Sequence, residues 1–367
     1  MLREEVTAAA DVPIAATSAM DGFAVRANDG AELFIGAESA AGAPRSMPIA
    51  TGEAAPISTG ALLPPGADAV VAIEDCVVDG SRVTVGGSVR PLQFVRNKGS
   101  DLEAGEVLLH RGVTINAAAI ALLAAQGRAS VRVACRPRVA VLSMGRELKP
   151  PGSALAPGDL YDANGPALAA MCVEAGAEAV LVPIVADDEA ALAAALINLD
   201  ADLIVTSGGA SVGEHDHLRG AIERTGGEIL LWRVAMKPGK PLVLARVGQR
   251  PLLGLPGNPV SAMVSFALFG RPLVRRCLGC EPADDSVRVA VVLDTPLSTK
   301  SDRRTFLRAR VRADGATLRA ELATRQGSAA LVSLRGANAL VEVPAGEHDY
   351  EAGASVFALM FDTLLSR

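Results

Sequence analysis

A loop rich in glycine and serine, followed directly by acidic residues, carries the most suggestive chemistry in the chain. The loop spans residues 207–216, SGGASVGEHD, and follows a short apolar run, Leu203–Val205, that is typical of a buried strand. Glycine lets the backbone approach a ligand closely, so that backbone N–H groups can surround an anion. Carboxylates beside such a loop can hold a cation against the same anion. The pattern therefore predicts a site for a charged, phosphorylated molecule.

Two further loops carry groups that suit an anion. Lys237 and Lys240 lie three residues apart around Pro238 and Gly239. Proline fixes the backbone φ angle, so a stiff loop of this kind can aim both ammonium groups at one anion. The turn GLPGNP at residues 254–259 enters a predicted helix, and helix N-termini attract anions. Solvated lysines and a plain surface turn are the simpler alternatives for these two loops.

The glycine-rich loop also matches two patterns with other functions. Its G-x-S-x-G string resembles the nucleophile elbow of α/β-hydrolases, in which the serine lies on the turn directly between strand and helix. Ser211 instead lies five residues beyond Thr206, inside a longer loop, which disfavours a hydrolase. His215, Asp216 and His217 are suitable ligands for a transition metal. We interpret them as solvated residues, with Asp216 capping a helix and contacting Mg²⁺.

Residues 136–280 alternate between apolar runs and helical segments, which predicts the element that positions these loops. Strands separated by helices indicate a doubly wound parallel sheet. In such sheets, ligands bind beyond the carboxyl ends of the strands. The loops that begin at Ser143, Ser207 and Pro256 each follow a predicted strand. We therefore expect these three loops to converge on one site.

The flanking regions have mostly β character, so the fold class is multidomain α/β plus β. Residues 1–135 form a mostly-β N-terminal and linker region with a shortened N-terminus, residues 136–280 the α/β domain, and residues 281–367 a small C-terminal β-barrel. In the barrel region, Leu307, Ala309 and Val311 alternate with arginines at 308, 310 and 312. This alternation predicts a strand with one apolar and one basic face.

Composition excludes several classes of protein. The chain has 367 residues and a net charge of −6 without a dense cluster of basic residues, so it lacks the footprint of a nucleic-acid-binding protein. Its longest apolar run, Ala117–Ala125, is far shorter than the roughly 20 residues that span a membrane. Five widely spaced cysteines do not form a disulfide framework, and Cys277 with Cys280 lacks the further ligands of a zinc site. We expect a cytoplasmic protein.

Six strings along the chain together resemble one family, the molybdopterin molybdenumtransferases of the MoeA type, which are related to the C-terminal domain of gephyrin. They follow the family's order and span nearly the whole chain, so the set is highly specific. The strings are SAMDGFAV at 18–25, STGALLPPGADAVV at 58–71, YDANG at 161–165, TSGGASVGEHD at 206–216, AMKPGKPL at 235–242 and GLPGNPVSAMVSF at 254–266.

The resemblance implies an enzyme of molybdenum-cofactor biosynthesis. Its substrates would be molybdate and adenylylated molybdopterin, and Mg²⁺ would assist cleavage of the adenylate, with release of AMP and the finished cofactor. It also implies a homodimer, in which the active site is shared between the α/β domain of one subunit and the N-terminal segment of its partner. Other proteins of molybdenum-cofactor biosynthesis are expected partners.

The same resemblance assigns roles to residues of this chain. Catalytic roles fall to Asp21, Thr59, Asp216, Lys237 and Lys240. Residues expected to bind the pterin, phosphate or molybdate are Ser207, Gly208, Gly209, Ser211, Gly213, Pro256, Asn258 and Pro259. The expected Mg²⁺ ligands are Asp21, Glu178 and Asp216.

One segment departs from the family pattern. The family usually carries S-T-G-D-E-L after the first strand of the α/β domain, where this chain has SMGREL at 143–148. Met144 and Arg146 thus replace a hydroxyl group and an acid, which leaves open whether Arg146 adds positive charge for the substrate or the activity is weakened. Two alternative functions also stay open: a molybdopterin adenylyltransferase, and a non-catalytic pterin-binding scaffold.

Overall fold

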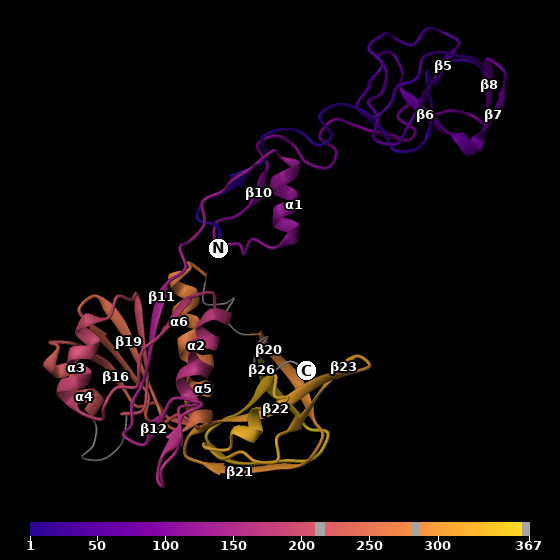
Figure 1. Ribbon diagram of the computed structural model, residues 1–367. Helices are drawn as coiled ribbons and strands as arrows, with labels where there is room; N and C mark the ends of the chain where they lie inside the picture. The colour runs from indigo at the N-terminus through magenta and orange to yellow at the C-terminus, as the bar shows by residue number, and fades with distance from the viewer. Residues whose placement is uncertain (210–216, 281–286, 362–367) are drawn as a thin grey trace. The chain divides into compact units, whose positions relative to one another are not determined.

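The computed structural model describes residues 1–209, 217–280 and 287–361 (Figure 1). The chain divides into two compact units. One unit comprises Leu2–Val133, and the other comprises Met1 together with Ala134–Arg367. The α/β region and the C-terminal β region therefore belong to one unit. No helix among the described residues combines the length and the apolar character needed to cross a membrane.

The first unit is built around a six-stranded sheet with the strand order β6-β3-β5-β4-β8-β7. Its strands are β3 (Gly22–Val25), β4 (Glu32–Ile35), β5 (Glu53–Ile57), β6 (Ala69–Ala72), β7 (Cys76–Asp79) and β8 (Arg82–Val85). The turn between β7 and β8 contains Gly80 at a φ of 57°, which suits the Asp-Gly pair of a tight hairpin turn. A short 3₁₀ turn, η1 (Ile73–Asp75), precedes β7.

Smaller elements complete this unit. Strand β1 (Val6–Thr7) pairs with β10 (Val107–Leu109), and β2 (Thr17–Ser18) pairs with β9 (Val95–Arg96). Helix α1 (Ala117–Ala125) begins at Asn116, whose side chain accepts a hydrogen bond from the N–H of Ala119. Asparagine is a favoured residue at this position because it satisfies a free N–H of the first turn.

The α/β region contains a six-stranded sheet in the order β14-β11-β15-β19-β18-β16. Its strands are β11 (Arg138–Ser143), β14 (Glu178–Leu181), β15 (Leu203–Ser207), β16 (Glu228–Trp232), β18 (Val243–Val247) and β19 (Arg250–Leu255). The first four strands in that order are parallel, as expected. Strand β18 runs antiparallel to both of its neighbours, β19 and β16. Only Gly248 and Gln249 join β18 to β19, and a parallel crossover needs a dozen or more residues.

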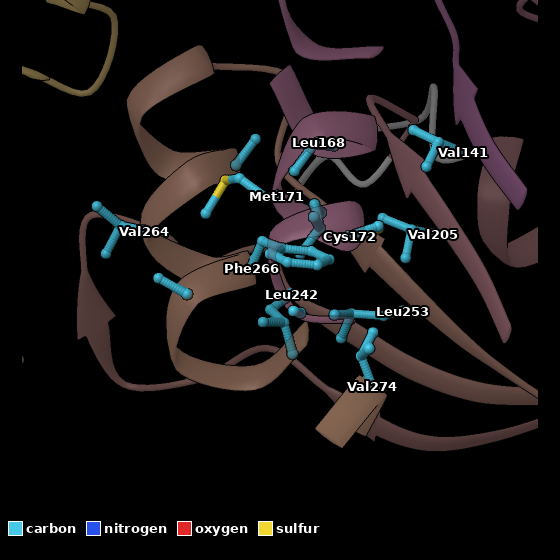
Figure 2. Close-up of a cluster of buried hydrophobic side chains, with 14 of the residues drawn as sticks. Val141, Leu168, Met171, Cys172, Val205, Leu242, Leu253, Val264, Phe266 and Val274 are labelled. Atoms are coloured by element: carbon cyan, nitrogen blue, oxygen red, sulfur yellow. The ribbon is translucent and has the colours of Figure 1, made fainter. Parts of the chain in front are cut away.

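Helices cover both faces of this sheet, and alternate strand residues pack on opposite layers. Val139, Val141 and Val205 pack with α2 (Asn164–Glu174) and the continuous helical segment of α5, η2 and α6. Figure 2 shows Val141 and Val205 in this cluster. That segment consists of α5 (Pro259–Ser265), a π-helical turn η2 (Phe266–Gly270) and α6 (Arg271–Cys277). Ala140 and Leu142 face the second layer, made by α3 (Glu189–Asn198) and α4 (His217–Arg224). This alternation confirms the doubly wound arrangement.

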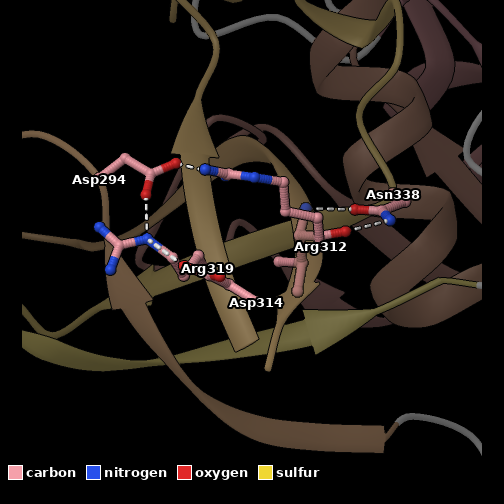
Figure 3. A network of polar contacts seen from close by, with 6 residues as sticks. Asp294, Arg312, Asp314, Arg319 and Asn338 are labelled. Atoms are coloured by element: carbon pink, nitrogen blue, oxygen red, sulfur yellow. Dashed lines mark hydrogen bonds and ion pairs between the residues drawn. The ribbon is translucent and has the colours of Figure 1, made fainter. Parts of the chain in front are cut away.

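The C-terminal region forms a closed barrel, because β22 pairs with β23 on one side and with β24 on the other. The strands are β20 (Val287–Leu293), β22 (Arg304–Asp314), β23 (Thr317–Leu322), β24 (Ala339–Val343) and β26 (Ser355–Met360), with a separate ribbon of β21 (Leu297–Ser301) and β25 (Gly346–Tyr350). Figure 3 shows Asp294 between Arg312 and Arg319, which donate to its two carboxylate oxygens at 2.5 Å and 2.6 Å. Strand β17 (Met236–Lys237) extends the barrel sheet by pairing with β22.

Candidate functional site

A cavity of about 940 Å³ lies at the carboxyl edge of the parallel strands; we call it the sheet-edge cavity. The loops after β11, β15 and β19 supply Met144, Gly208 and Gly257 to its lining, so the expected convergence of the three loops is confirmed. Residues from β12 (Leu148–Lys149), β13 (Leu160–Tyr161) and the 3₁₀ turn η4 (Leu331–Leu334) of the C-terminal region complete the wall. The position agrees with the general rule for ligand sites in open α/β sheets.

Asn164 fastens two of these loops together. Its side-chain Nδ2 donates to Ser207 Oγ and to the carbonyl oxygen of Gly257, both at 2.7 Å. The Asn164 side chain is itself held at the start of α2, where the Asp162 carboxylate accepts from the N–H groups of Asn164 (3.0 Å) and Gly165 (2.9 Å). A carboxylate is favourable there because the N-terminus of a helix carries partial positive charge. The loops after β15 and β19 that line the cavity are thus connected to the N-terminus of α2.

Gly208 and Gly209, at the described start of the glycine-rich loop, lie directly against Met144. Gly208 and Gly209 adopt positive φ angles of 92° and 69°, and a Cβ at Gly209 would overlap the methyl group of Met144. Met144 is buried, and its N–H donates to the carbonyl oxygen of Ser207. Met144 therefore supports the loop by apolar packing, whereas Arg146 is exposed and does not belong to the cavity lining.

The two lysines of the KPGK loop face different cavities. Lys240 lines the sheet-edge cavity, whereas Lys237 lines a second cavity of about 520 Å³, which we call the barrel cavity. Lys237 lies beside the barrel because it pairs with Thr305 where β17 joins β22. The structure therefore does not bring the two lysines to the same cavity. Each lysine supplies positive charge to its own cavity.

Arg308, which also lines the barrel cavity, is completely buried. Its guanidinium donates to Ser333 Oγ at 3.1 Å and to the carbonyl oxygens of Phe306, Arg325 and Gly327. Burial lowers its pKa to about 10. Within the described ranges no carboxylate pairs with it, so a buried positive charge without a counter-ion lies beside the cavity. The expected basic face of this strand is incorrect at Arg308, because the loop that follows β23 covers it.

Comparison with known proteins identifies the family. The chain matches three family models, for the MoeA N-terminal region (domain I and II) at residues 1–127, a probable molybdopterin binding domain at 140–276 and the MoeA C-terminal region (domain IV) at 290–361. A molybdopterin molybdenumtransferase of Nostoc is 36% identical over 373 residues, which cover 98% of this chain and 86% of that protein. This chain belongs to the MoeA family.

Other relatives agree in sequence and in structure. Molybdopterin molybdenumtransferase 2 of Mycobacterium tuberculosis is 37% identical over 324 residues, covering 84% of this chain and 80% of that protein. The crystal structure of a molybdopterin biosynthesis MoeA protein from Pyrococcus horikosii superposes with a TM-score of 0.82 at 32% identity, over 99% of this chain and 91% of that one. The relatives named as transferases place this MoeA-family chain among enzymes of that class.

The structure brings together two of the expected catalytic residues in the N-terminal unit. Asp21 Oδ1 accepts a hydrogen bond of 2.6 Å from the N–H of Thr59, 38 residues away in the sequence. This N–H, and then the hydroxyl of Thr59, lower the pKa of the exposed Asp21 carboxyl below its usual value. Hydrogen bonds to the ionised form have this effect. Asp21 is thus a carboxylate available to a ligand of this MoeA-family protein.

Other expected site residues of the MoeA-family chain fall into three groups. Pro256, Asn258 and Pro259 line the sheet-edge cavity, with Pro259 at the first position of α5. The Ser207 hydroxyl is buried and engaged by Asn164, so it acts as an anchor. Residues that fall outside the described ranges are Ser211, Gly213 and Asp216.

Glu178 is not brought to either cavity. It begins β14, pairs with Arg138 at the amino end of the parallel strands, and lies 3.8 Å from the Nε of that arginine. The sheet-edge cavity lies at the carboxyl end of the same strands. Because a strand separates the two ends, the expectation that Glu178 joins the other Mg²⁺ ligands does not fit this geometry.

Three acids that our sequence reasoning left out line the sheet-edge cavity: Glu147, Asp162 and Asp187. Carboxylate oxygens suit Mg²⁺, which is bound through one or two carboxylates and keeps several waters. Within residues 1–209, 217–280 and 287–361, no three acidic, histidine or cysteine side chains lie close enough together to form a metal site by themselves. Asp188 caps α3, because its side chain accepts a hydrogen bond from the N–H of Ala191. The preceding acid, Asp187, is therefore not needed for the cap, and this pair of acids is the sequence signal that could have pointed to Asp187 as a cavity residue.

Proposed function

We propose that this MoeA-family protein inserts molybdenum from molybdate into adenylylated molybdopterin in molybdenum-cofactor biosynthesis, with release of AMP. The observation that carries the proposal is the sheet-edge cavity, where a glycine loop at positive φ, Lys240 and three carboxylates meet at the carboxyl ends of three strands. Cleavage of a phosphoanhydride depends mainly on positioned charges, and such a site supplies them. The relatives' names give the reaction class.

Mg²⁺ would bind at Glu147 or Asp187, with Asp162 committed to the start of α2. When bound, the ion neutralises charge on the phosphoanhydride. The residues of the chain have separate tasks. The backbone N–H of Gly208 donates to the carbonyl oxygen of Leu255 at 3.1 Å, so the N–H of Gly209 would orient a phosphate oxygen. Lys240 would offset the charge of the phosphate. Asp21, held by Thr59, and Asp216 keep their expected roles as part of this proposal.

Molybdate would occupy the barrel cavity. Lys237 and the buried Arg308 provide positive charge there, and Ser298, Thr299 and Ser301 line the same space. The Thr299 hydroxyl is buried and has no hydrogen-bond partner within the described ranges. A buried, unpaired hydroxyl is costly unless a partner reaches it, and an oxyanion would do so. The two substrates would then lie on either side of the KPGK loop.

The test is a complete reaction in vitro. Wild type is incubated with adenylylated molybdopterin, Mg²⁺ and molybdate, and the released AMP and finished cofactor are measured. We expect Lys240→Ala to lower the rate at least tenfold, because one charge on the phosphate side is lost. Lys149→Ala is the matched control, since this lysine pairs with Asp159 and does not line the cavity.

Two results would contradict the proposed reaction. Adenylylation of free molybdopterin with ATP, without AMP release from the adenylylated form, would identify an adenylyltransferase. Binding of adenylylated molybdopterin without turnover would identify a scaffold. The expected cytoplasmic location and contacts with other cofactor-biosynthesis proteins belong to the same proposal.

A homodimer is the second part of the proposal, and helix α1 supports it. All nine of its residues are alanine, leucine or isoleucine, yet only Ala119 and Leu123 are buried within the unit. A helix that is apolar on all sides is normally buried. A second copy of the chain would cover the exposed side, and the N-terminal segment with Asp21 would serve the partner's cavity.

Sedimentation of two matched variants tests this dimer. Ile120 on α1 and Ile197 on α3 are both 57% exposed, so glutamate at either position meets similar surroundings in a monomer. We expect Ile120→Glu to shift the protein to monomers and Ile197→Glu to leave its mass unchanged. Equal behaviour of both variants would exclude α1 from the interface.

A further inference from the structure

Tyr161 is the one aromatic residue among those that line the sheet-edge cavity in the described part of the chain. It ends the short strand β13, which pairs with β12 at the rim of the cavity through Leu148 with Leu160 and Lys149 with Tyr161. Its side chain is 47% exposed, a large fraction for an aromatic residue in a chain that is only 3% aromatic. The loops of the cavity bear phosphate-binding groups, for which a tyrosine ring has no evident use.

The Tyr161 ring is held at both ends. Its hydroxyl donates to the carbonyl oxygen of Ser153 at 2.8 Å. Its backbone is fixed on both sides, because the N–H of Leu160 donates to Glu147 O (2.7 Å) and the N–H of Asp162 donates to Lys149 O (2.9 Å). A ring that is positioned before a ligand arrives loses little conformational entropy on binding. These hydrogen bonds therefore hold the exposed Tyr161 ring in position to contact a ligand.

Three leucines line the same cavity as Tyr161. They are Leu148, Leu160 and Leu331, of which Leu160 and Leu331 are 59% and 44% exposed. A cavity lined by apolar side chains and an aromatic ring, together with glycines and a lysine, matches a ligand with two different ends. One end is a flat, conjugated ring system, and the other is a charged phosphate.

We propose that Tyr161 stacks against a planar heteroaromatic ring of the substrate and so positions the attached phosphate at the glycine loop. The proposal rests on the proposed function, in which the substrate carries two such rings, a pterin and an adenine. Stacking on an aromatic side chain accepts any flat π-face. The shared chemistry is therefore a heteroaromatic ring joined to a phosphate, and the experiment separates the two rings.

The test uses the fact that the chain has only two tyrosines, Tyr161 and Tyr350. Full-length protein with ¹³C-labelled tyrosine rings gives two sets of ring signals, which a Tyr350→Phe variant assigns. Either AMP or 6-hydroxymethylpterin is added. We expect the Tyr161 ring signals to shift with at least one of them, while those of Tyr350, on β25 of the C-terminal region, stay in place. Constant Tyr161 signals with both ligands would overturn the proposal.

Affinities of variants provide the second readout. We expect Tyr161→Leu to weaken binding of the ligand that shifts the signals by about 10- to 100-fold, the usual loss when a stacking ring is removed. Tyr161→Phe keeps the ring and should stay within about threefold of wild type, since stacking does not need the hydroxyl. Tyr350→Leu is the matched control. Equal affinities of wild type and Tyr161→Leu would contradict stacking.

AMP release from adenylylated molybdopterin, measured on the same preparations, separates this proposal from the proposed function. Turnover by wild type with unchanged Tyr161 signals would refute stacking and leave the reaction intact. Shifted Tyr161 signals without turnover would support stacking and refute the reaction. With both intact, Tyr161→Leu should raise KM far more than it lowers kcat, because stacking acts on binding.

Discussion

Replacement of Asn164 by alanine tests whether one side chain holds the sheet-edge cavity together. Asn164 is 8% exposed and joins the start of α2 to the end of β15 and to the loop after β19. Asn164→Ala removes both hydrogen bonds without adding bulk. The Ser207 hydroxyl keeps a weaker contact to Pro256 O at 3.4 Å, but the carbonyl oxygen of Gly257 loses its donor.

The expected cost follows from these contacts. Two lost hydrogen bonds cost about 0.5–1.5 kcal/mol each. Gly257 is exposed, so water can replace the donor to its carbonyl oxygen and adds no further penalty there. Asn164 Oδ1 is buried without a hydrogen-bond partner within the described ranges, and its removal offsets part of the cost. The free energy of unfolding should therefore fall by about 1–2 kcal/mol.

The single tryptophan of the chain makes this loss measurable in one region. Trp232 lies in β16 of the same sheet, so its fluorescence during urea unfolding reports the α/β region and not the N-terminal unit. With a slope of about 3 kcal/mol per molar urea, the unfolding midpoint should fall by about 0.3–0.7 M.

A matched control makes the result decisive. Asn198→Ala removes an exposed asparagine on α3 whose Nδ2 donates to the carbonyl oxygen of Ala194. We expect its midpoint to stay within about 0.2 M of wild type, because exposed hydrogen bonds contribute little. If Asn164→Ala and Asn198→Ala shift the midpoint equally, the two hydrogen bonds of Asn164 do not hold the loops.

Two further predictions concern the N-terminal unit and the glycine loop. Thr59→Val should raise the pKa of Asp21 part of the way to its usual value, because the hydrogen bond from the Thr59 hydroxyl is lost while the stronger bond from its N–H remains. Titration of the carboxyl ¹³C signal measures this pKa, and an unchanged value would refute the prediction. Since the folded-state pKa is lowered, the Asp21 contact stabilises the unit above the unfolded-state pKa, and this contribution is lost as the pH falls through the folded-state value. Gly209→Ala should lower AMP release at least tenfold, because the new Cβ overlaps Met144 and the φ is 69°. Met144→Ala should restore part of this loss, whereas an equal loss in the double variant would show that backbone strain alone is responsible.

The sequence predicted the location of the main cavity because that location follows from topology. Ser143, Ser207 and Leu255 end neighbouring strands, and parallel strands that end at one edge bring their loops together. The direction of β18 was predictable too, since two residues between strands allow only a hairpin. Glu178 stands just before a predicted strand, a position that already indicates the opposite edge of the sheet.

Two other features depend on contacts between distant segments. Period-two alternation shows that Arg308 shares a strand face with Arg310, but it does not show that a loop near Gly327 covers one of them and leaves the other exposed. Lys237 and Lys240 line separate cavities because β17 pairs with a barrel strand that is distant in the sequence. Arg303, just before that strand, donates to the carbonyl oxygen of Met236, 67 residues away. Local spacing contains no information about such a pairing.

The buried guanidinium of Arg308 gives the barrel cavity a charge that does not respond to acidity. Its pKa of about 10 still lies well above neutrality, so the group keeps its proton throughout the range found in living cells. A histidine in its place would gain or lose charge between about pH 5 and 8. For the oxyanion proposed as its ligand, the charge offered by Arg308 is therefore the same at every pH in that range.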